Sequence, residues 1–81
     1  MREVIYVKWK DAQGGRGSDT DEYINRRQAM TMESAGIYIS EDDKVVRLTQ
    51  DVSHDDGGHT NRDWQIIPKV NIIKVKRFKV R

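Results

Sequence analysis

The fold of this chain is decided by one stretch, Ile66-Ile67-Pro68-Lys69-Val70-Asn71-Ile72-Ile73-Lys74-Val75. Its β-branched pairs suit a pleated surface and predict two strands, Arg62 to Ile67 and Ile72 to Phe78. Pro68 cannot donate a hydrogen bond to a strand ladder, so the segment from Pro68 to Asn71 is a short break. At this point an ordinary hairpin loop and a single tight helical turn both remain open for the junction.

Three further strands are expected upstream, at Arg2 to Lys10, Glu33 to Ser40 and Lys44 to Val52, because their apolar residues alternate with polar ones. The residues expected to share an inner face are Ile5, Val7 and Trp9 in the first strand, Ala35, Ile37 and Ile39 in the second, and Val46, Leu48 and Val52 in the third. The opposite face of the first strand carries Val4, Tyr6 and Lys8. Gly36 suggests a bend or bulge inside the second strand.

A short helix is expected between the first two strands, from Asp19 to Met30, and it follows a glycine-rich linker at Gln13 to Gly17. Asp19 and Glu22 have the spacing of an N-cap residue and its partner three positions on. A helix of about three turns would not persist alone, so we expect it to pack on the sheet. The segment from Ser53 to Asn61 is expected to be a polar loop.

Length and composition exclude several classes of protein. The chain has 81 residues and forms one small domain, residues 1–81, with a net charge of +2 and no cysteine. No stretch is apolar enough to span a membrane, and the first residues lack the apolar core of a signal peptide, so we expect a cytoplasmic protein. Because so short a chain has a thin core, we also expect it to bury apolar surface against another copy as a homo-oligomer.

The order of these elements predicts the fold class. One strand, one helix and then four strands with short connections form a mainly β (α+β) domain, in which an antiparallel meander closes on itself. The break at Pro68 is similar to the single 3₁₀ turn that joins the last two strands of SH3-like and Sm-like barrels. We therefore expect a small antiparallel five-stranded SH3-like or Sm-like barrel with one short helix between strands 1 and 2.

Three segments together resemble a family of small uncharacterised bacteriophage proteins, and they are Tyr6 to Ala12, Met32 to Asp51, and Ile66 to Val75. The second segment has the family pattern Glu-Ser-Val-Gly, an apolar strand, an acidic turn and a further strand. This chain departs from that pattern at Ala35, where valine is usual, and at Thr49, where alanine is usual. The resemblance implies a phage accessory protein of the host cell cytoplasm, involved in host takeover or anti-defence, and it implies no reaction.

The residues themselves do not indicate an enzyme. The segment from Ser53 to His59 contains two histidines and two aspartates, which are side chains that can bind a divalent metal. Its two glycines make it a flexible loop, however, so the ligands would not be held at a fixed spacing. The segment that starts at Asp51 does not match the calcium-binding loop of an EF-hand, because it has Asp56 where that loop needs glycine and Arg62 where it needs glutamate. No serine lies in a nucleophile-elbow context. We therefore expect no catalytic residue, no metal and no cofactor.

Charge is unevenly distributed, and this is the better functional signal. Residues 41–63 carry three basic and seven acidic groups, whereas residues 64–81 carry six basic groups and no acidic one. A row of cations on a strand can neutralise phosphates, and Tyr6, Trp9, Tyr38 and Trp64 can stack on bases. The alternative, which involves no ligand, is a charged edge strand whose lysines prevent edge-to-edge aggregation. The ligand-binding residues expected in the turns and the last strand are Arg47, Lys69, Asn71, Lys74, Lys76 and Arg77.

Two functions remain open. The first is a homo-oligomeric, non-enzymatic binder of nucleotide or nucleic acid. The second is a protein-binding inhibitor or adaptor that blocks a host enzyme through its charged faces. A purely structural role is neither supported nor excluded by the residues.

Overall fold

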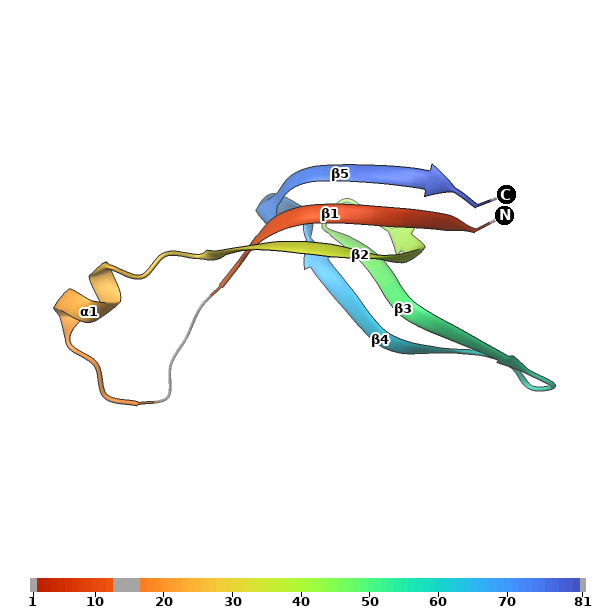
Figure 1. The fold of residues 1–81 in the computed structure, drawn as a ribbon, viewed down its shortest axis with the longest axis horizontal. Helices are drawn as coiled ribbons and strands as arrows, with labels where there is room; N and C mark the ends of the chain where they lie inside the picture. The colour runs from red at the N-terminus through yellow and green to blue at the C-terminus, as the bar shows by residue number, and fades with distance from the viewer. Residues whose placement is uncertain (1, 13–16, 81) are drawn as a thin grey trace.

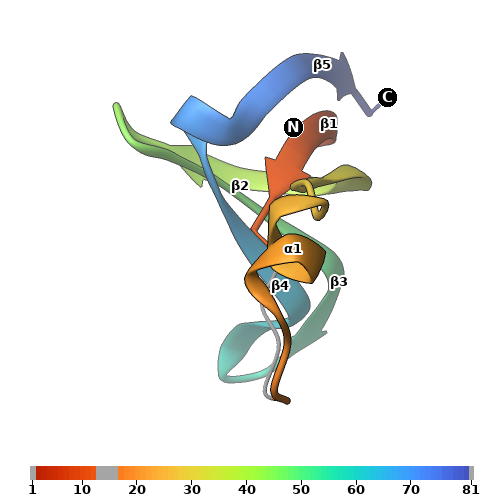
Figure 2. The ribbon, with the colours of Figure 1, turned by 90° about the vertical axis from the view of Figure 1, so that its left-hand side faces the viewer.

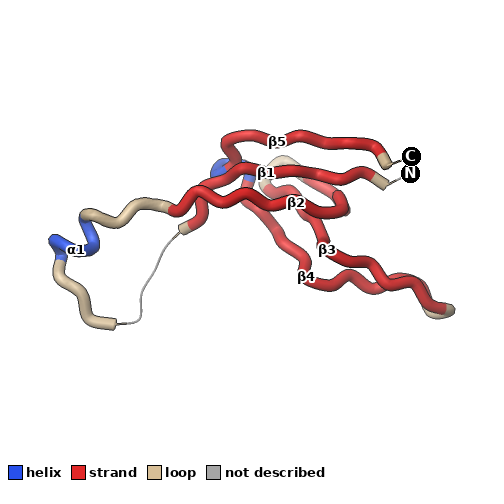
Figure 3. The backbone as a smooth tube through the Cα atoms, in the orientation of Figure 1, coloured by secondary structure: helices blue, strands red, loops and turns tan. Residues whose placement is uncertain are grey.

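A computed structural model describes residues 2–12 and 17–80, and in it five antiparallel strands form one sheet in the order β4-β3-β2-β1-β5 (Figure 1). The strands are β1 (Glu3–Asp11), β2 (Met30–Glu41), β3 (Val45–Asp55), β4 (Gly58–Pro68) and β5 (Ile72–Lys79). One short helix, α1 (Asp21–Asn25), lies between β1 and β2, and one 3₁₀ turn, η1 (Lys69–Asn71), lies between β4 and β5 (Figure 3). The mainly β class, the five strands and the place of the helix are therefore confirmed. The sheet is not closed, because β4 and β5 form its two edges.

The junction after Pro68 is the tight helical turn, not a hairpin loop. Pro68 precedes η1 in an extended conformation, and the backbone N–H of Ile72 closes the turn by donating to the carbonyl oxygen of Lys69. The N–H of Lys69 donates to the carbonyl oxygen of Lys44 at 2.8 Å. This bond holds η1 against the turn between β2 and β3. η1 leads directly into β5, which pairs antiparallel with β1.

The core is small and lies between β1 on one side and β3 and β4 on the other. Its buried apolar residues are Ile5, Val7, Trp9, Val46, Leu48 and Ile67. The inner faces expected for the first strand and for Val46 and Leu48 are confirmed, whereas Val52 is only half-buried. The sheet is strongly twisted, and Figure 2 shows β1 and β5 on one side of β2, and β3 and β4 on the other.

The inner face of β2 is opposite to the one expected. Ser34 is buried, while Ala35 and Ile39 are exposed and Ile37 is half-buried. The register explains this, because Ser34 lies opposite the buried Val7 and therefore shares its face. Its hydroxyl accepts a hydrogen bond of 3.0 Å from the indole N–H of Trp9. A buried polar residue with a partner thus replaces the apolar residue that the alternation predicted.

Gly36 marks the place where β2 and β3 approach most closely. A Cβ atom added there would lie 2.6 Å from the carbonyl oxygen of Thr49 and 3.0 Å from a methyl carbon of Leu48. The register of β1 and β2 runs without interruption through Gly36, and the irregularity in β2 lies between Tyr38 and Ser40 instead, so the bulge expected at this glycine is not found there. Glycine is needed at this position because a side chain has no room beside β3.

The helix is shorter than the expected range of Asp19 to Met30, and it does not pack on the sheet. It begins after Thr20, whose side-chain oxygen accepts from the N–H of Tyr23 at 3.2 Å, so Thr20 and not Asp19 is the N-cap. None of its residues is buried, and Figure 1 shows it away from the strands at one end of the molecule. Met30 instead begins β2 and pairs with Asp11, because a strand ladder gives its backbone more partners than a frayed helix end.

The segment from Ser53 to Asn61 is a hairpin and not a loop. His54 pairs with His59, and Asp55 pairs with Gly58, which leaves a turn of two residues, Asp56 and Gly57. Gly58 has a φ of 123°, a conformation that favours glycine, and the Asp55 carboxylate accepts from the N–H of Gly57 at 2.9 Å. The hairpin is an arm on one side of an elongated molecule with extents of 54 × 26 × 20 Å.

Candidate ligand-binding surfaces

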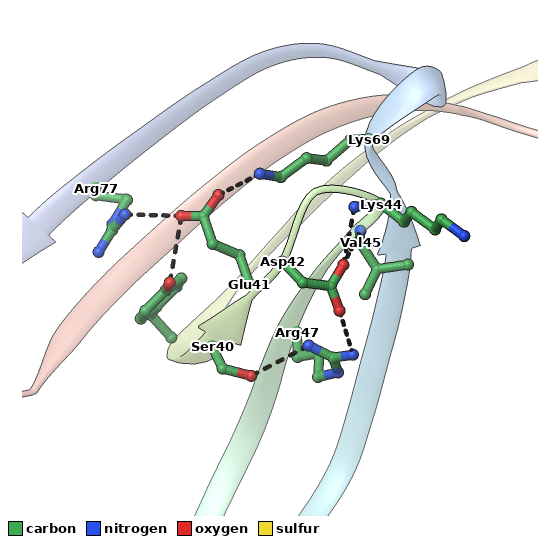
Figure 4. Close-up of polar contacts among 9 residues, drawn as sticks. Ser40, Glu41, Asp42, Lys44, Val45, Arg47, Lys69 and Arg77 are labelled. Carbon is green, nitrogen blue, oxygen red and sulfur yellow. Dashed lines mark hydrogen bonds and ion pairs between the residues drawn. The ribbon is translucent and has the colours of Figure 1, made fainter.

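Two of the expected ligand-binding cations, Lys69 and Arg77, are held by carboxylates in one network (Figure 4). The Lys69 ammonium lies 2.6 Å from Glu41, and the Arg77 guanidinium lies 2.6 Å from Glu3 and 2.9 Å from Glu41. Arg77 also lies over the ring of Tyr38, 4.1 Å from its centroid. Two cations and two carboxylates balance, so this network links β1, β2, η1 and β5 and offers no surplus positive charge to a ligand.

The ionisation of these groups follows from their contacts. The hydrogen bond from Lys69 is the main cause that lowers the pKa of Glu41. Burial, followed by the charge of Glu41, raises the pKa of the Tyr38 hydroxyl, which donates to Glu41 at 3.2 Å. The hydrogen bond to Glu3 is the main cause that raises the pKa of Arg77. The shifts of Glu41 and Arg77 favour their charged forms and therefore the ion pairs, whereas the shift of Tyr38 keeps its hydroxyl neutral as a donor.

Arg47 is likewise paired. Its guanidinium lies 2.8 Å from the carboxylate of Asp42 and 3.4 Å from the hydroxyl of Ser40 (Figure 4). Asp42 also accepts from the backbone N–H groups of Lys44 and Val45, at 2.8 and 3.0 Å. The bond from Lys44 is the largest cause that lowers the pKa of Asp42 to about 2, and Arg47 comes next. Arg47 therefore closes the turn between β2 and β3.

Lys74 and Lys76 lie elsewhere, on the face of β1 and β5 that points away from the core, which we call the outer face. Lys74 lies directly opposite Lys8 in the β1–β5 register, and Lys76 lies opposite Tyr6. We call Lys8, Lys74 and Lys76 the lysine row. Within residues 2–12 and 17–80, none of the three forms an ion pair. Like charges placed directly opposite on neighbouring strands destabilise a sheet. Lys8 has a carboxylate on its other side, because Glu33 lies opposite it in the β1–β2 register, whereas Lys74 lies on the edge strand β5 and pairs across the sheet with Lys8 alone.

Aromatic rings accompany the lysine row. Tyr6 lies in the β1–β5 register opposite Lys76, and its hydroxyl donates to Glu33 at 2.5 Å, a bond that is the main cause of the raised pKa of Tyr6. Phe78 follows two residues after Lys76, on the same outer face, and 55% of it is exposed. Cations beside exposed rings are the pattern of surfaces that bind single-stranded nucleic acid. Of the other aromatics proposed for stacking, Trp9 is buried and Tyr38 is covered by Arg77.

Trp64 lies beside a groove that the sequence did not indicate. The groove has a volume of about 430 Å³ and opens between the first half of β2 and the bend of β3 and β4. Its lining residues are Met32, Glu33, Ser34, Ala35, Gln50, Asp63, Trp64 and Gln65. Trp64 is 61% exposed, and Asp63 has a φ of 54°, in the left-handed region that non-glycine residues rarely adopt.

The remaining expected features give no further site. Asn71 ends η1 and is half-buried. His54 and His59 face each other with ring centroids 6.0 Å apart, but the described part of the chain holds no group of three or more metal-ligating side chains. Residues 13–16 of the glycine-rich segment lie outside the described residues. No helix in the described ranges has the length and apolar character needed to cross a membrane.

Lys8 and Asp63 are the functional candidates that the sequence analysis missed. Alternation had placed Lys8 on the outer face, but its position opposite Lys74 depends on a register that residue patterns do not give. Comparison of the chain with models of protein families, with curated proteins and with solved structures gives no match.

Proposed function

We propose that this chain is a non-enzymatic binding protein that takes a nucleotide or a single-stranded nucleic acid on the outer face of β1 and β5. The observation that carries the proposal is the lysine row, in which Lys8 and Lys74 oppose each other and neither forms an ion pair in the described residues. A phosphate between the two ammonium groups would convert their repulsion into attraction. Tyr6 and Phe78 flank the row as stacking surfaces for bases.

We further propose that the protein is an open SH3-like or Sm-like barrel that assembles as a homo-oligomer. The strand order and the single 3₁₀ turn before β5 support the fold. β5 is paired with β1 on one edge only, and Ile73 and Val75 on it are 53% and 47% exposed. A second copy would satisfy the open backbone groups and cover these side chains. The cellular role that we propose is that of a phage accessory protein in host takeover or anti-defence.

The test is binding of a fluorescently labelled oligothymidylate, followed by fluorescence anisotropy over a range of salt concentrations. Three lysine–phosphate contacts predict a slope of about −2 in log K against log salt, at about −0.7 per contact for a single strand. Replacing Lys74 and Lys76 by glutamine should weaken binding at low salt and flatten the slope to about −0.7.

The matched control is Lys44→Gln together with Arg62→Gln, which removes the same charge from exposed positions outside the lysine row. This control should bind as the unmodified protein does. Equal weakening in both double variants would show that only the net charge matters. A strict monomer in native mass spectrometry, with no binding of oligothymidylate or of a nucleotide at low salt, would refute the proposal.

A second candidate function is a protein-binding inhibitor or adaptor. The observation that favours it is the groove beside Trp64, whose indole is exposed next to polar groups at a bend of the sheet. Exposed tryptophans at such places are typical anchors of protein interfaces. Its test is described below.

A further inference from the structure

The groove beside Trp64 exposes the edge of a strand. The ladder between β2 and β3 ends at the pair Ile37 and Thr49, and the two strands diverge from there. The first half of β2 continues to pair with β1, so from Met30 to Ser34 one edge is occupied and the other has no strand partner in the described residues. The groove lies along this second edge from Met32 to Ala35. The side-chain amide of Gln50 donates to the carbonyl oxygen of Ala35 at 2.7 Å, where the next backbone bond of the ladder would lie.

The lining of the groove confirms that it runs along an edge. Successive side chains of a strand point to opposite faces, so a hollow on one face is lined by alternate residues. This groove is lined by the four consecutive residues 32–35 of β2 and by the consecutive residues 63–65 of β4. Backbone groups of β2 are therefore accessible from it. An extended segment laid along Met30 to Ser34 would find about 17 Å of strand, at about 3.4 Å per residue.

Charge selects the kind of segment that fits. The groove is lined by two carboxylates, those of Glu33 and Asp63, and by no cation. Glu33 borders the lysine row, because it lies opposite Lys8 and accepts from Tyr6, whereas Asp63 lies across the groove on β4. A lysine or arginine side chain is the complementary group, and Trp64 offers it an exposed ring face.

The backbone of Asp63 keeps the groove open on its far side. Its φ of 54° turns β4 at this point, and strained positions of this kind are concentrated at binding sites. Asp63 is followed directly by Trp64, so the turn also sets where the indole lies.

We propose that the groove binds an extended, basic segment of a partner protein, which adds as a strand to the free edge of β2 from Met30 to Ser34. Main-chain hydrogen bonds to β2 give affinity, as in other cases of strand addition. Glu33 and Asp63 select a cationic side chain, and Trp64 covers it. The inference rests on protein binding, the second candidate function above.

The probe is the capped peptide Val-Lys-Val-Lys-Val-Lys, titrated into the full chain by calorimetry and followed by amide NMR. We expect binding with shifts at residues 30–34, and at least tenfold weaker binding of the matching peptide with glutamate in place of lysine. The double variant Glu33→Gln with Asp63→Asn should bind the lysine peptide at least tenfold more weakly than the unmodified protein does. Asparagine tolerates the left-handed backbone of Asp63, so this variant should keep its fold. The control Asp51→Asn with Asp56→Asn removes equal charge outside the groove and should bind normally.

Two N-methylated peptides test the strand geometry directly. A strand added to one edge uses the N–H groups of alternate residues only. Methylation of one alternate set should therefore abolish binding, while methylation of the other set should leave it nearly unchanged. Equal binding of both methylated peptides, equal weakening in both double variants, or no binding would overturn the inference. Loss of self-association in Glu33→Gln with Asp63→Asn would assign the groove to a second copy and would also overturn it.

One further outcome distinguishes failure of the groove proposal from failure of the protein-binding function on which the proposal rests. A partner protein that binds the chain with equal affinity after Glu33→Gln with Asp63→Asn would leave protein binding intact and would refute the groove as its site.

Discussion

Lys74→Glu should stabilise the fold while it weakens ligand binding. In the native sheet Lys74 lies directly opposite Lys8, and a glutamate there would exchange a repulsive cross-strand pair for an attractive one. An opposite-charge pair contributes about 0.2–1 kcal/mol, and a like-charge pair costs a comparable amount. Because Lys74 is exposed, we expect a gain of about 1 kcal/mol or less, which for a domain of this size raises the melting temperature by roughly 4–8 °C per kcal/mol.

The assay is thermal unfolding followed by circular dichroism, at low salt and at about 1 M salt, where the Debye length falls to about 3 Å. The control is Lys76→Glu, which removes the same charge from the same face but lies opposite Tyr6, so it should bring no gain. Equal stabilisation by both variants, or a gain at low salt that persists in full at high salt, would refute the electrostatic reasoning. If the Lys74→Glu variant unfolds at a higher temperature than the unmodified protein and also binds ligand more weakly, the lysine row serves binding at a cost to stability.

Three further predictions concern the fold. Ser34→Ala leaves the buried indole N–H of Trp9 without its acceptor and should lower the free energy of unfolding by about 1–3 kcal/mol in urea denaturation; an unchanged midpoint would contradict this. Gly36→Ala places a methyl group 2.6 Å from the Thr49 carbonyl oxygen and should cost about 1–3 kcal/mol, and a neutral result would show that β2 and β3 can move apart. The pKa of Asp42 is lowered from 3.8 to about 2, so its contribution to stability is present above about pH 4 and is lost as pH falls toward 2. Urea titrations across this range should show a flatter profile for Asp42→Asn, and an unaltered profile would be evidence against the assignment.

The sequence predicted the elements better than it predicted their faces. Alternation placed Ile5, Val7 and Trp9 correctly, because all three are apolar at alternate positions and the residues between and after them are Tyr6, Lys8 and Lys10. It failed in β2, where the inner positions hold Ser34 and a glycine. Their roles, as acceptor for an indole and as a crossing point, depend on the neighbouring strands and leave no mark on hydrophobic periodicity.

The candidate sites could also be predicted only in part from the sequence. That the last strand is basic could be read from the sequence, but the carboxylates that hold Arg77 and Lys69 come from β1 and β2, far away along the chain. Tertiary pairing thus leaves Lys74 and Lys76 as the expected cations without acidic partners in the described residues. The polar residues from Ser53 to Asn61 lack apolar alternation, yet they pair as strands because a tight two-residue turn brings them together.

The position of β1 in the sheet has a consequence for how the chain folds. β1 precedes the other strands in the chain, yet one of its neighbours is β5, and Glu3 lies opposite Lys79 in that ladder. During synthesis the β1–β2 and β3–β4 hairpins can form before β5 has emerged from the ribosome, while the second edge of β1 is still unpaired. Contacts so distant in sequence slow folding toward the millisecond-to-second range. Until β5 arrives, a nascent chain exposes the β1 edge to other chains, and high expression at elevated temperature should favour aggregation at that stage.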